Sequence, residues 1–540
     1  MSSPGIVRHT ARGRVRSAAA LGLAIATTTA VYAPRLRAQV VPGRGAAIGS
    51  LGADRARLDQ ISGAPPEGGG DSTGTERWRA IAPTVLIVRN SDLPMGGNDG
   101  ALWAGRGMNV SITTGVTIRQ ILKGVGAELD IAPVVTYSQN ETFQIIPGRQ
   151  SGRSAFSSPW HLGTASADLP LRFGDEPLRT IGLGQSAFSL RSGPIEVGAS
   201  AKNEWWGPGL RTSLILSNNA GGIPRLYAST ARPLRTRIAL VSARMFVGEL
   251  TESPFFDVIL DNNTRAASGF LLSVRPLVDT NLTMGVSRLV LSPITSNFAF
   301  VSHVVDALTY WHPTKAPDDT LPNGQSAQTH DQMTATFARW IFPESGFEVF
   351  GELARTELPR SVREFLEAPQ STQAYTLGTQ WSRSLGGMRR FRIQAELGYL
   401  EQTLVWSDRT PMDYYTGRAT AQGFTERGQV LGASSGPGSS TQFLASDWIE
   451  RAWQVGVLLG RTRTENDALY RQRFAADTRH DVTYMGGIRG GKRFSATDVS
   501  VEIIASHRLN YLFQSQYEIA RPVFARDVSN LTLSLRMDPR

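Results

Sequence analysis

The chain has 540 residues, of which 41% are apolar, 8% aromatic and 19% charged, with 54 glycines and no cysteine. The lack of cysteine excludes disulfides, thiolate metal sites, iron–sulfur clusters and cysteine nucleophiles. The formal net charge is +10, but residues 1–38 hold six arginines and no acid, which leaves +4 for the rest of the chain. Because the remaining basic residues are interspersed with acids, we expect no nucleic-acid partner.

Residues 1–38 predict an export signal. Arg8 to Arg16 form a basic region, Ala18 to Val31 form a short apolar stretch, and Leu36-Arg37-Ala38 fits a cleavage site before Gln39. The apolar stretch is shorter than the roughly 20 residues that a membrane-spanning helix needs. We therefore expect the protein to leave the cytoplasm.

Residues 39–80 predict a periplasmic segment that contains a helix and a linker. Apolar residues at Leu51, Leu58 and Ile61 alternate with charged ones, which is typical of a short amphipathic helix. Residues 63–75 (GAPPEGGGDSTGT) have the composition of a flexible linker.

Residues 81–540 predict strands. In residues 392–399, Arg392, Gln394 and Glu396 alternate with apolar residues, and residues 126–137 and 530–537 alternate in the same way. Charged residues recur on the polar face, and the apolar face often ends in an aromatic such as Tyr137 or Tyr399. This pattern favours an all-β, transmembrane barrel over a large secreted β-protein. The length predicts roughly 16–20 strands.

Motifs for catalysis and for metal binding are weak. Residues 432–436 (GASSG) match the G-x-S-x-G pattern around Ser434, but they lie in a glycine- and serine-rich stretch and not in a strand-to-helix turn. The histidines after the signal are not paired at ligand spacing. We predict no catalytic residue, no metal site and no cofactor.

An aromatic, glycine-rich segment is the most informative part of the chain. Residues 203–209 (NEWWGPG) place two tryptophans beside Asn203 and Glu204. Tryptophan rings can stack on sugar rings, while amide and carboxylate groups can bond sugar hydroxyls. The alternative is that the two tryptophans pack inside a folded plug or an interface belt.

The segment from Asn203 to Ala220 resembles the signature of the Wzi-type capsule assembly family. Other segments follow in the order of that family, at residues 98–107 (NDGALWAGRG), 172–174 (RFG), 184–186 (GQS), 348–352 (EVFGE) and 423–432 (GFTERGQVLG). The resemblance spans about residues 45 to 520. It implies an outer-membrane barrel of about 18 antiparallel strands that acts as a lectin and holds capsular polysaccharide at the cell surface.

On this basis we expect non-covalent binding of capsular or other surface polysaccharide by a barrel that contacts outer-membrane lipid. The residues expected to contact the glycan or to form the cup around it are Asn203, Glu204, Trp205, Trp206, Asn218, Asn219, Thr425 and Arg427. Two alternatives stay open. A porin that passes oligosaccharides would conduct ions, and an outer-membrane hydrolase would need a Ser/His pair in the lumen.

Overall fold

The computed structural model describes residues 48–63, 77–122, 124–148, 150–161, 165–294, 296, 298–313, 328–402, 412–471, 479–513 and 527–540. The predicted signal at residues 1–38 and positions 64–75 of the predicted linker lie outside these residues. Among the described residues, no helix is both long enough and apolar enough to cross a bilayer.

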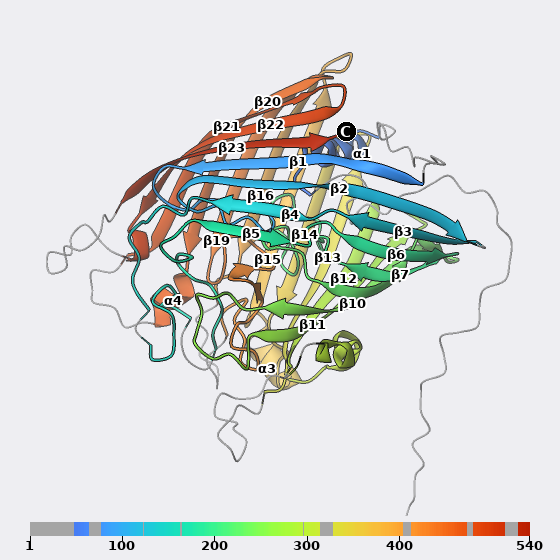
Figure 1. Cartoon of the computed structure of the whole chain (residues 1–540). Helices are drawn as coiled ribbons and strands as arrows, with labels where there is room; N and C mark the ends of the chain where they lie inside the picture. Colours follow the sequence, from blue (N-terminus) through green and yellow to red (C-terminus); the bar gives the residue numbers. More distant parts are fainter. Residues whose placement is uncertain are drawn as a thin grey trace, which may run out of the picture. The chain divides into compact units, whose positions relative to one another are not determined.

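Antiparallel strands form one large sheet (Figure 1). Its strands are β1 (Trp78–Asn90), β2 (Gly107–Leu122), β3 (Val125–Ile131), β4 (Val134–Ser138), β5 (Leu178–Gly182), β6 (Ala187–Ser192), β7 (Ile195–Ser200), β8 (Arg225–Thr230), β9 (Leu234–Arg235), β10 (Ala239–Thr251), β11 (Thr264–Pro276), β12 (Leu282–Pro293), β13 (Asp331–Phe342), β14 (Phe347–Arg355), β15 (Gln373–Ser384), β16 (Arg390–Tyr399), β19 (Ser440–Ile449), β20 (Trp453–Thr464), β21 (Asp481–Arg493), β22 (Thr497–Leu509) and β23 (Val528–Pro539).

The remaining elements lie in connections between these strands or before β1. They are α1 (Leu51–Ile61), η1 (Ala299–His303), α2 (Asp306–Thr309), α3 (Val362–Glu367), the short strands β17 (Thr425–Glu426) and β18 (Gln429–Val430), α4 (Asn466–Arg471) and η2 (Tyr511–Phe513).

The sheet closes on itself, because β1 pairs with both β2 and β23. Three strands of the barrel are each divided into two pieces: β3 and β4 form one, β5 and β6 another, and β8 and β9 the third. The twenty-one described strands of the sheet therefore make an 18-stranded barrel. The first interruption has a local cause. Pro133 lacks an N–H for the ladder, and opposite it a Cβ at Gly115 would lie 1.7 Å from the Ile131 carbonyl oxygen. The predicted fold class is confirmed, although β1 begins at Trp78 and not at residue 81.

The predicted alternation of faces is also confirmed. Leu397 and Leu533 point outward and are 47% and 42% exposed, whereas Arg392, Gln394 and Glu396 are buried on the lumen side. A soluble sandwich would place its apolar face inside. Apolar side chains outside and charged ones inside are the arrangement of a barrel surrounded by lipid.

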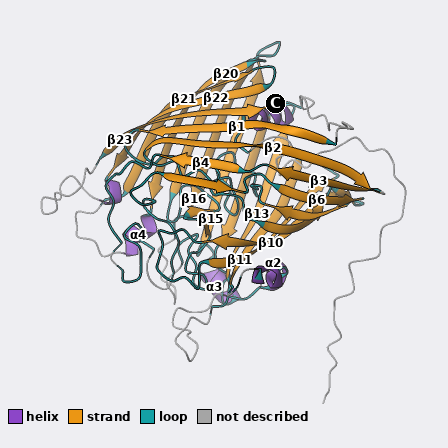
Figure 2. Cartoon of the chain, viewed as in Figure 1, coloured by secondary structure: helices purple, strands orange, loops and turns teal. Residues whose placement is uncertain are grey.

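The connections differ between the two ends of the barrel. Short turns join β13 to β14, β15 to β16, β19 to β20, and β21 to β22, and we call this end the turn end. Long connections at residues 139–177, 201–224, 294–330 and 400–439 emerge at the other end, the loop end. Figure 2 shows the loops gathered at that end, with α3 and α4 among them. In outer-membrane barrels the short turns face the periplasm and the long loops face outward.

Helix α1 lies in the lumen at the turn end. Ser50 caps it by accepting a hydrogen bond from the Ala53 N–H at 3.1 Å. Asp54 accepts two hydrogen bonds from Arg392, at 2.7 and 2.9 Å. Burial opposes ionisation of Asp54, but the paired Arg392 guanidinium outweighs it and lowers the pKa of Asp54 to about 2. The N-terminal segment is therefore held by the barrel through charge.

Candidate functional site

Four segments that the sequence singled out interlock inside the loop end. We call residues 98–107, 172–174, 203–220 and 423–432 the loop core. Asn98 Nδ2 donates to the Arg211 carbonyl at 2.9 Å, and Gln429 Nε2 donates to the carbonyls of Leu102 and Asn219 at 3.3 and 3.1 Å. Segments that are hundreds of residues apart thus become one unit through backbone-directed hydrogen bonds.

The tryptophan pair lies within the loop core and not on its surface. Trp206 is 1% exposed, and its ring centroid lies 5.4 Å from that of Phe246 on β10. Its Nε1 donates to the Glu204 carboxylate at 2.7 Å. Trp205 is buried as well. Trp206 therefore packs in the lumen core, and the burial of both rings favours the packing alternative over sugar stacking.

Glu204 is held in an ion-pair network. Its Oε1 lies 2.5 Å from Arg225 and 2.6 Å from Arg244. Burial alone would raise the pKa of Glu204, but the two guanidinium groups outweigh burial and lower it. The carboxylate is thus charged, and its oxygens are occupied by partners within the protein.

The three predicted asparagines bond backbone carbonyls: Asn203 does so within its own loop, and Asn218 and Asn219 join that loop to others. Asn203 Nδ2 donates to the Ala220 carbonyl at 2.7 Å, and Asn218 Nδ2 donates to the Asn98 carbonyl at 2.7 Å. Asn219 Nδ2 donates to the Val430 carbonyl at 2.9 Å. Each amide therefore satisfies a backbone group that the strand ladder does not reach.

Strands β17 and β18 form a two-residue hairpin that presents Arg427. Arg427 and Gly428 have φ values of 49° and 83°, as a type I′ turn requires, and a Cβ at Gly428 would lie 2.8 Å from the Phe173 ring. Thr425 at the base is buried and accepts from Arg265 at 3.1 Å. The Arg427 side chain is 67% exposed, the largest exposure among the eight predicted residues.

The hairpin docks on the loop end of β10 among carboxylates that the sequence analysis missed. Glu426 accepts from the Thr251 N–H at 2.8 Å, and the Arg427 N–H donates to the Thr251 carbonyl at 2.9 Å. Burial raises the pKa of Glu426 and of Glu252 to about 7, and that of Asp168 to about 6. Isolated acids on separate loops give no spacing signal, so only the fold brings them together.

A row of aromatic rings continues from this hairpin. Trp103 and Phe173 have ring centroids 4.5 Å apart, Phe173 and Phe255 are 5.7 Å apart, and Phe255 and Phe156 are 5.8 Å apart. Trp103, Phe156 and Phe255 are partly exposed. Two of these rings lie in segments that carried the family resemblance, but their stacking joins three separate loops and could not be predicted.

One set of three side chains among the described residues has the geometry of a metal site. The ligand atoms of His303, Asp306 and His330 lie within 4.8 Å of one another. The set is satisfied without an ion, because Asp306 Oδ2 accepts from Ser292 at 3.0 Å and lies 2.7 and 3.2 Å from the two ring nitrogens.

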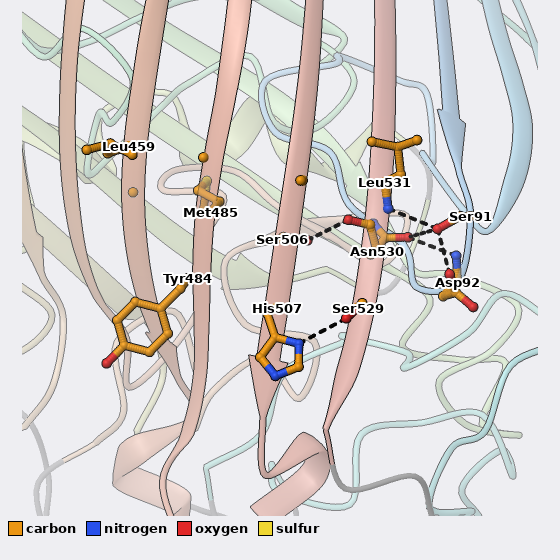
Figure 3. Close-up of a pocket in the computed structure, with 13 residues that line it drawn as sticks. Ser91, Asp92, Leu459, Tyr484, Met485, Ser506, His507, Ser529, Asn530 and Leu531 are labelled. Atoms are coloured by element: carbon orange, nitrogen blue, oxygen red, sulfur yellow. Dashed lines mark hydrogen bonds between the residues drawn. The ribbon is translucent and has the colours of Figure 1, made fainter.

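A hollow of about 790 Å³ lies on the outer wall of β20–β23 and not in the loop core (Figure 3). Leu459, Tyr484 and Leu531 border it, and His507 donates to or accepts from Ser529 at 3.0 Å near its polar edge. The glycines and alanine between these larger side chains leave the space open. Because the hollow faces away from the lumen, it is separate from the residues predicted to bind glycan.

The model of the capsule assembly protein Wzi family matches residues 129–521. The chain belongs to this family. The residues that carried the resemblance therefore identified it correctly, and a Wzi-family barrel of this kind is an outer-membrane protein, as predicted. A comparison with curated proteins finds no match.

Solved structures align with the chain at low identity, and Wzi from Escherichia coli shares its fold. Wzi from Escherichia coli, described as a carbohydrate-binding outer-membrane β-barrel involved in group 1 capsule assembly, is 10% identical, with a TM-score of 0.50 and 85% of each chain covered. OprD from Pseudomonas aeruginosa is 9% identical, with a TM-score of 0.39, and 86% of this chain and 94% of that chain are covered. OccAB2 from Acinetobacter baumannii is 7% identical, with a TM-score of 0.41 and coverage of 85% and 98%.

Proposed function

We propose that this Wzi-family barrel binds a surface polysaccharide non-covalently at its loop end and holds it at the cell surface. The observation that carries the proposal is family membership over residues 129–521, together with a loop core built from the segments that define the resemblance. The E. coli Wzi structure is a carbohydrate-binding barrel of the same fold. Many weak sugar contacts along one polymer then add through effective concentration.

The eight predicted residues divide into two roles in this proposal. Arg427 is the contact residue, because its exposed guanidinium can pair with a carboxylate on an acidic glycan. The other seven form the cup: their side chains are buried or bonded to neighbouring loops, and they fix the position of the hairpin that carries Arg427. Trp206 and Asn219 support this role most directly, since both connect the cup to β10 or β18.

The proposed activity is binding without bond cleavage. Incubation of the refolded full chain with purified capsular polysaccharide should leave the polymer length and the number of reducing ends unchanged. Turnover of the polymer would instead support the hydrolase alternative.

Binding itself tests the proposal. The refolded full chain in detergent should bind capsular polysaccharides that contain uronic acid more tightly than neutral ones. Arg427→Ala should weaken that binding, whereas Arg389→Ala, an exposed arginine in the turn between β15 and β16, should not. A folded barrel that binds none of the polysaccharides would overturn the proposal.

A further inference from the structure

A helical segment from the loop end lies against the outer wall of the barrel. We call residues 298–311 the strap, and it contains η1 and α2. The Ala307 N–H donates to Ser268 Oγ on β11 at 3.1 Å. Ser268 alternates along β11 with Ala267, whose side chain belongs to the lumen core, so Ser268 points outward. Figure 2 shows α2 beside the end of β11.

The wall beneath the strap includes polar side chains, although it belongs to the face that elsewhere meets lipid. Arg288 on β12 alternates with the lumen-facing Leu289, is 1% exposed and donates to Gln332 Oε1 on β13 at 2.6 Å. Its guanidinium also donates to the Tyr310 carbonyl and lies 3.6 Å from the centroid of the Trp311 ring. The strap thus supplies partners for an arginine that hydrocarbon would leave unpaired.

The other face of the strap is apolar and exposed. Phe298 is 78% exposed and Trp311 54%, and Val301, Val305 and Leu308 between them are exposed as well. These positions recur every three or four residues along η1, α2 and the residues at their ends. Met284, four residues before Arg288 on the outer face of β12, is also exposed, so the apolar face continues the lipid-facing wall.

A polar cluster fixes the strap to the barrel. His303 Nδ1 lies 2.7 Å and His330 Nε2 lies 3.2 Å from Asp306 Oδ2, and His330 directly precedes β13. Gln332 Nε2 donates to the His312 carbonyl at 2.7 Å just beyond the strap. The strap is therefore anchored at its polar side along its length, which orients the apolar side chains away from the wall.

We propose that the strap is an interfacial amphipathic segment that inserts Phe298, Val301, Val305, Leu308 and Trp311 into the outer leaflet of the membrane. Its occupant is lipid, because the face is continuous with a wall that lipid already covers and carries no charged side chain. Tryptophan is enriched at the depth of the lipid headgroups, where its indole ring contacts both water and hydrocarbon, and we place Trp311 at that depth. The strap covers Arg288 on β12. At this part of the outer wall, the lipid then meets the apolar side chains of the strap and not the guanidinium group.

The absence of cysteine allows a direct test. A nitroxide attached to V305C in the refolded full chain, reconstituted in phosphatidylcholine vesicles, should collide with oxygen more than with a water-soluble nickel chelate. L397C on the lipid-facing wall should behave in the same way, and R427C at the loop end should show the opposite preference. V301C gives a second strap position if V305C fails to fold, as judged by the gel shift on heating.

Two results would overturn the proposal. The first is a V305C label and a V301C label that collide with the nickel chelate as readily as the R427C label does, which would place the strap in water. The second is dipolar broadening between V305C labels on different molecules in the vesicles, which would place a second copy of the barrel against the strap.

Discussion

At the scale of single residues, buried side chains determine the shape of the loop core, and one exposed side chain, Arg427, is available to a ligand. Trp206 is the clearest buried case. Trp206→Ala removes its contact with Phe246 and leaves a cavity, which should lower the free energy of unfolding by about 3–5 kcal/mol. A folded barrel migrates faster on an SDS gel than the heat-unfolded chain, and the change to the slower band should then occur at a lower temperature.

Arg427→Ala is the matched control for that variant. Because the Arg427 side chain is exposed, its removal should leave the heating transition unchanged and should affect polysaccharide retention alone. A Trp206→Ala barrel with unchanged stability and lost retention would instead restore the sugar-stacking role that the sequence suggested.

A second residue-scale prediction concerns pH. His161 is buried and lies 2.9 Å from Glu465 and 3.5 Å from Asp413. Burial lowers the pKa of His161, but the two carboxylates outweigh burial and raise it to about 9. A folded pKa above the unfolded value of about 6.5 means that the stabilisation is complete below pH 6.5 and is lost as the pH rises through 9, on the order of 3 kcal/mol in all.

Unfolding of the full chain in detergent at pH 6, 8 and 10 measures this effect. The free energy of unfolding should fall across the series, and the fall should be smaller in His161→Gln. His507, which is exposed on the outer wall, offers the control variant His507→Gln, whose pH dependence should match that of the unmodified chain. Equal pH dependence in all three proteins would contradict the assigned role of His161.

At the scale of elements, the alternation along each strand decides which substitutions the barrel tolerates. Leu533 and Ser534 are neighbours near the middle of β23, the first facing lipid and the second facing the lumen. Leu533→Arg should cost about 2–4 kcal/mol because it places a charge in hydrocarbon, whereas Ser534→Arg should cost much less. Urea titration of the two variants in vesicles compares them directly, and equal costs would reverse the assigned faces.

The strands could be predicted from the sequence because their signal is local. Arg392 and Leu397 reveal their faces through a period of two, which any half-buried strand obeys. The contacts between loops at the loop end are not local: His161 lies beside Glu465, and Asn218 donates to Asn98, although no sequence pattern links these residues. The role of the tryptophan pair cannot be decided from the sequence for this reason, since burial is a property of the assembled loops.

The strap shows the opposite case, because its signal is local and lies in the sequence itself. Apolar residues from Phe298 to Trp311 recur at helical spacing within a chain otherwise read as strands and loops. Whether these residues face lipid or the lumen depends on the side of the wall they cover, and only the outward direction of Ser268 and Arg288 in the fold reveals that side. The spacing of apolar residues therefore indicates the kind of secondary structure better than it indicates whether a face meets lipid, water or the lumen.

At the scale of the whole molecule, the barrel carries structure in its lumen at both ends. Helix α1 occupies the turn end through ion pairs that include Arg57 with Glu348 at 2.7 Å. The loop core packs Trp206 and Leu214 against lumen-facing residues of β10 to β13 at the loop end. An ion that crosses the barrel must pass first one and then the other of α1 and the loop core. A porin needs an open path for ions, and these two obstructions oppose such a path.

Planar-bilayer recording of the refolded full chain distinguishes the two functions. We expect near silence at voltages where a porin of similar strand number conducts steadily. Deletion of residues 48–63 removes α1 and exposes Glu348 and Arg392 to lumen water, yet the loop core remains, so we expect no steady conductance from this variant either. If the deletion alone opened a stable channel, the loop core would not fill the lumen, and if the full chain conducted steadily, the transport function would replace the lectin function proposed for the barrel.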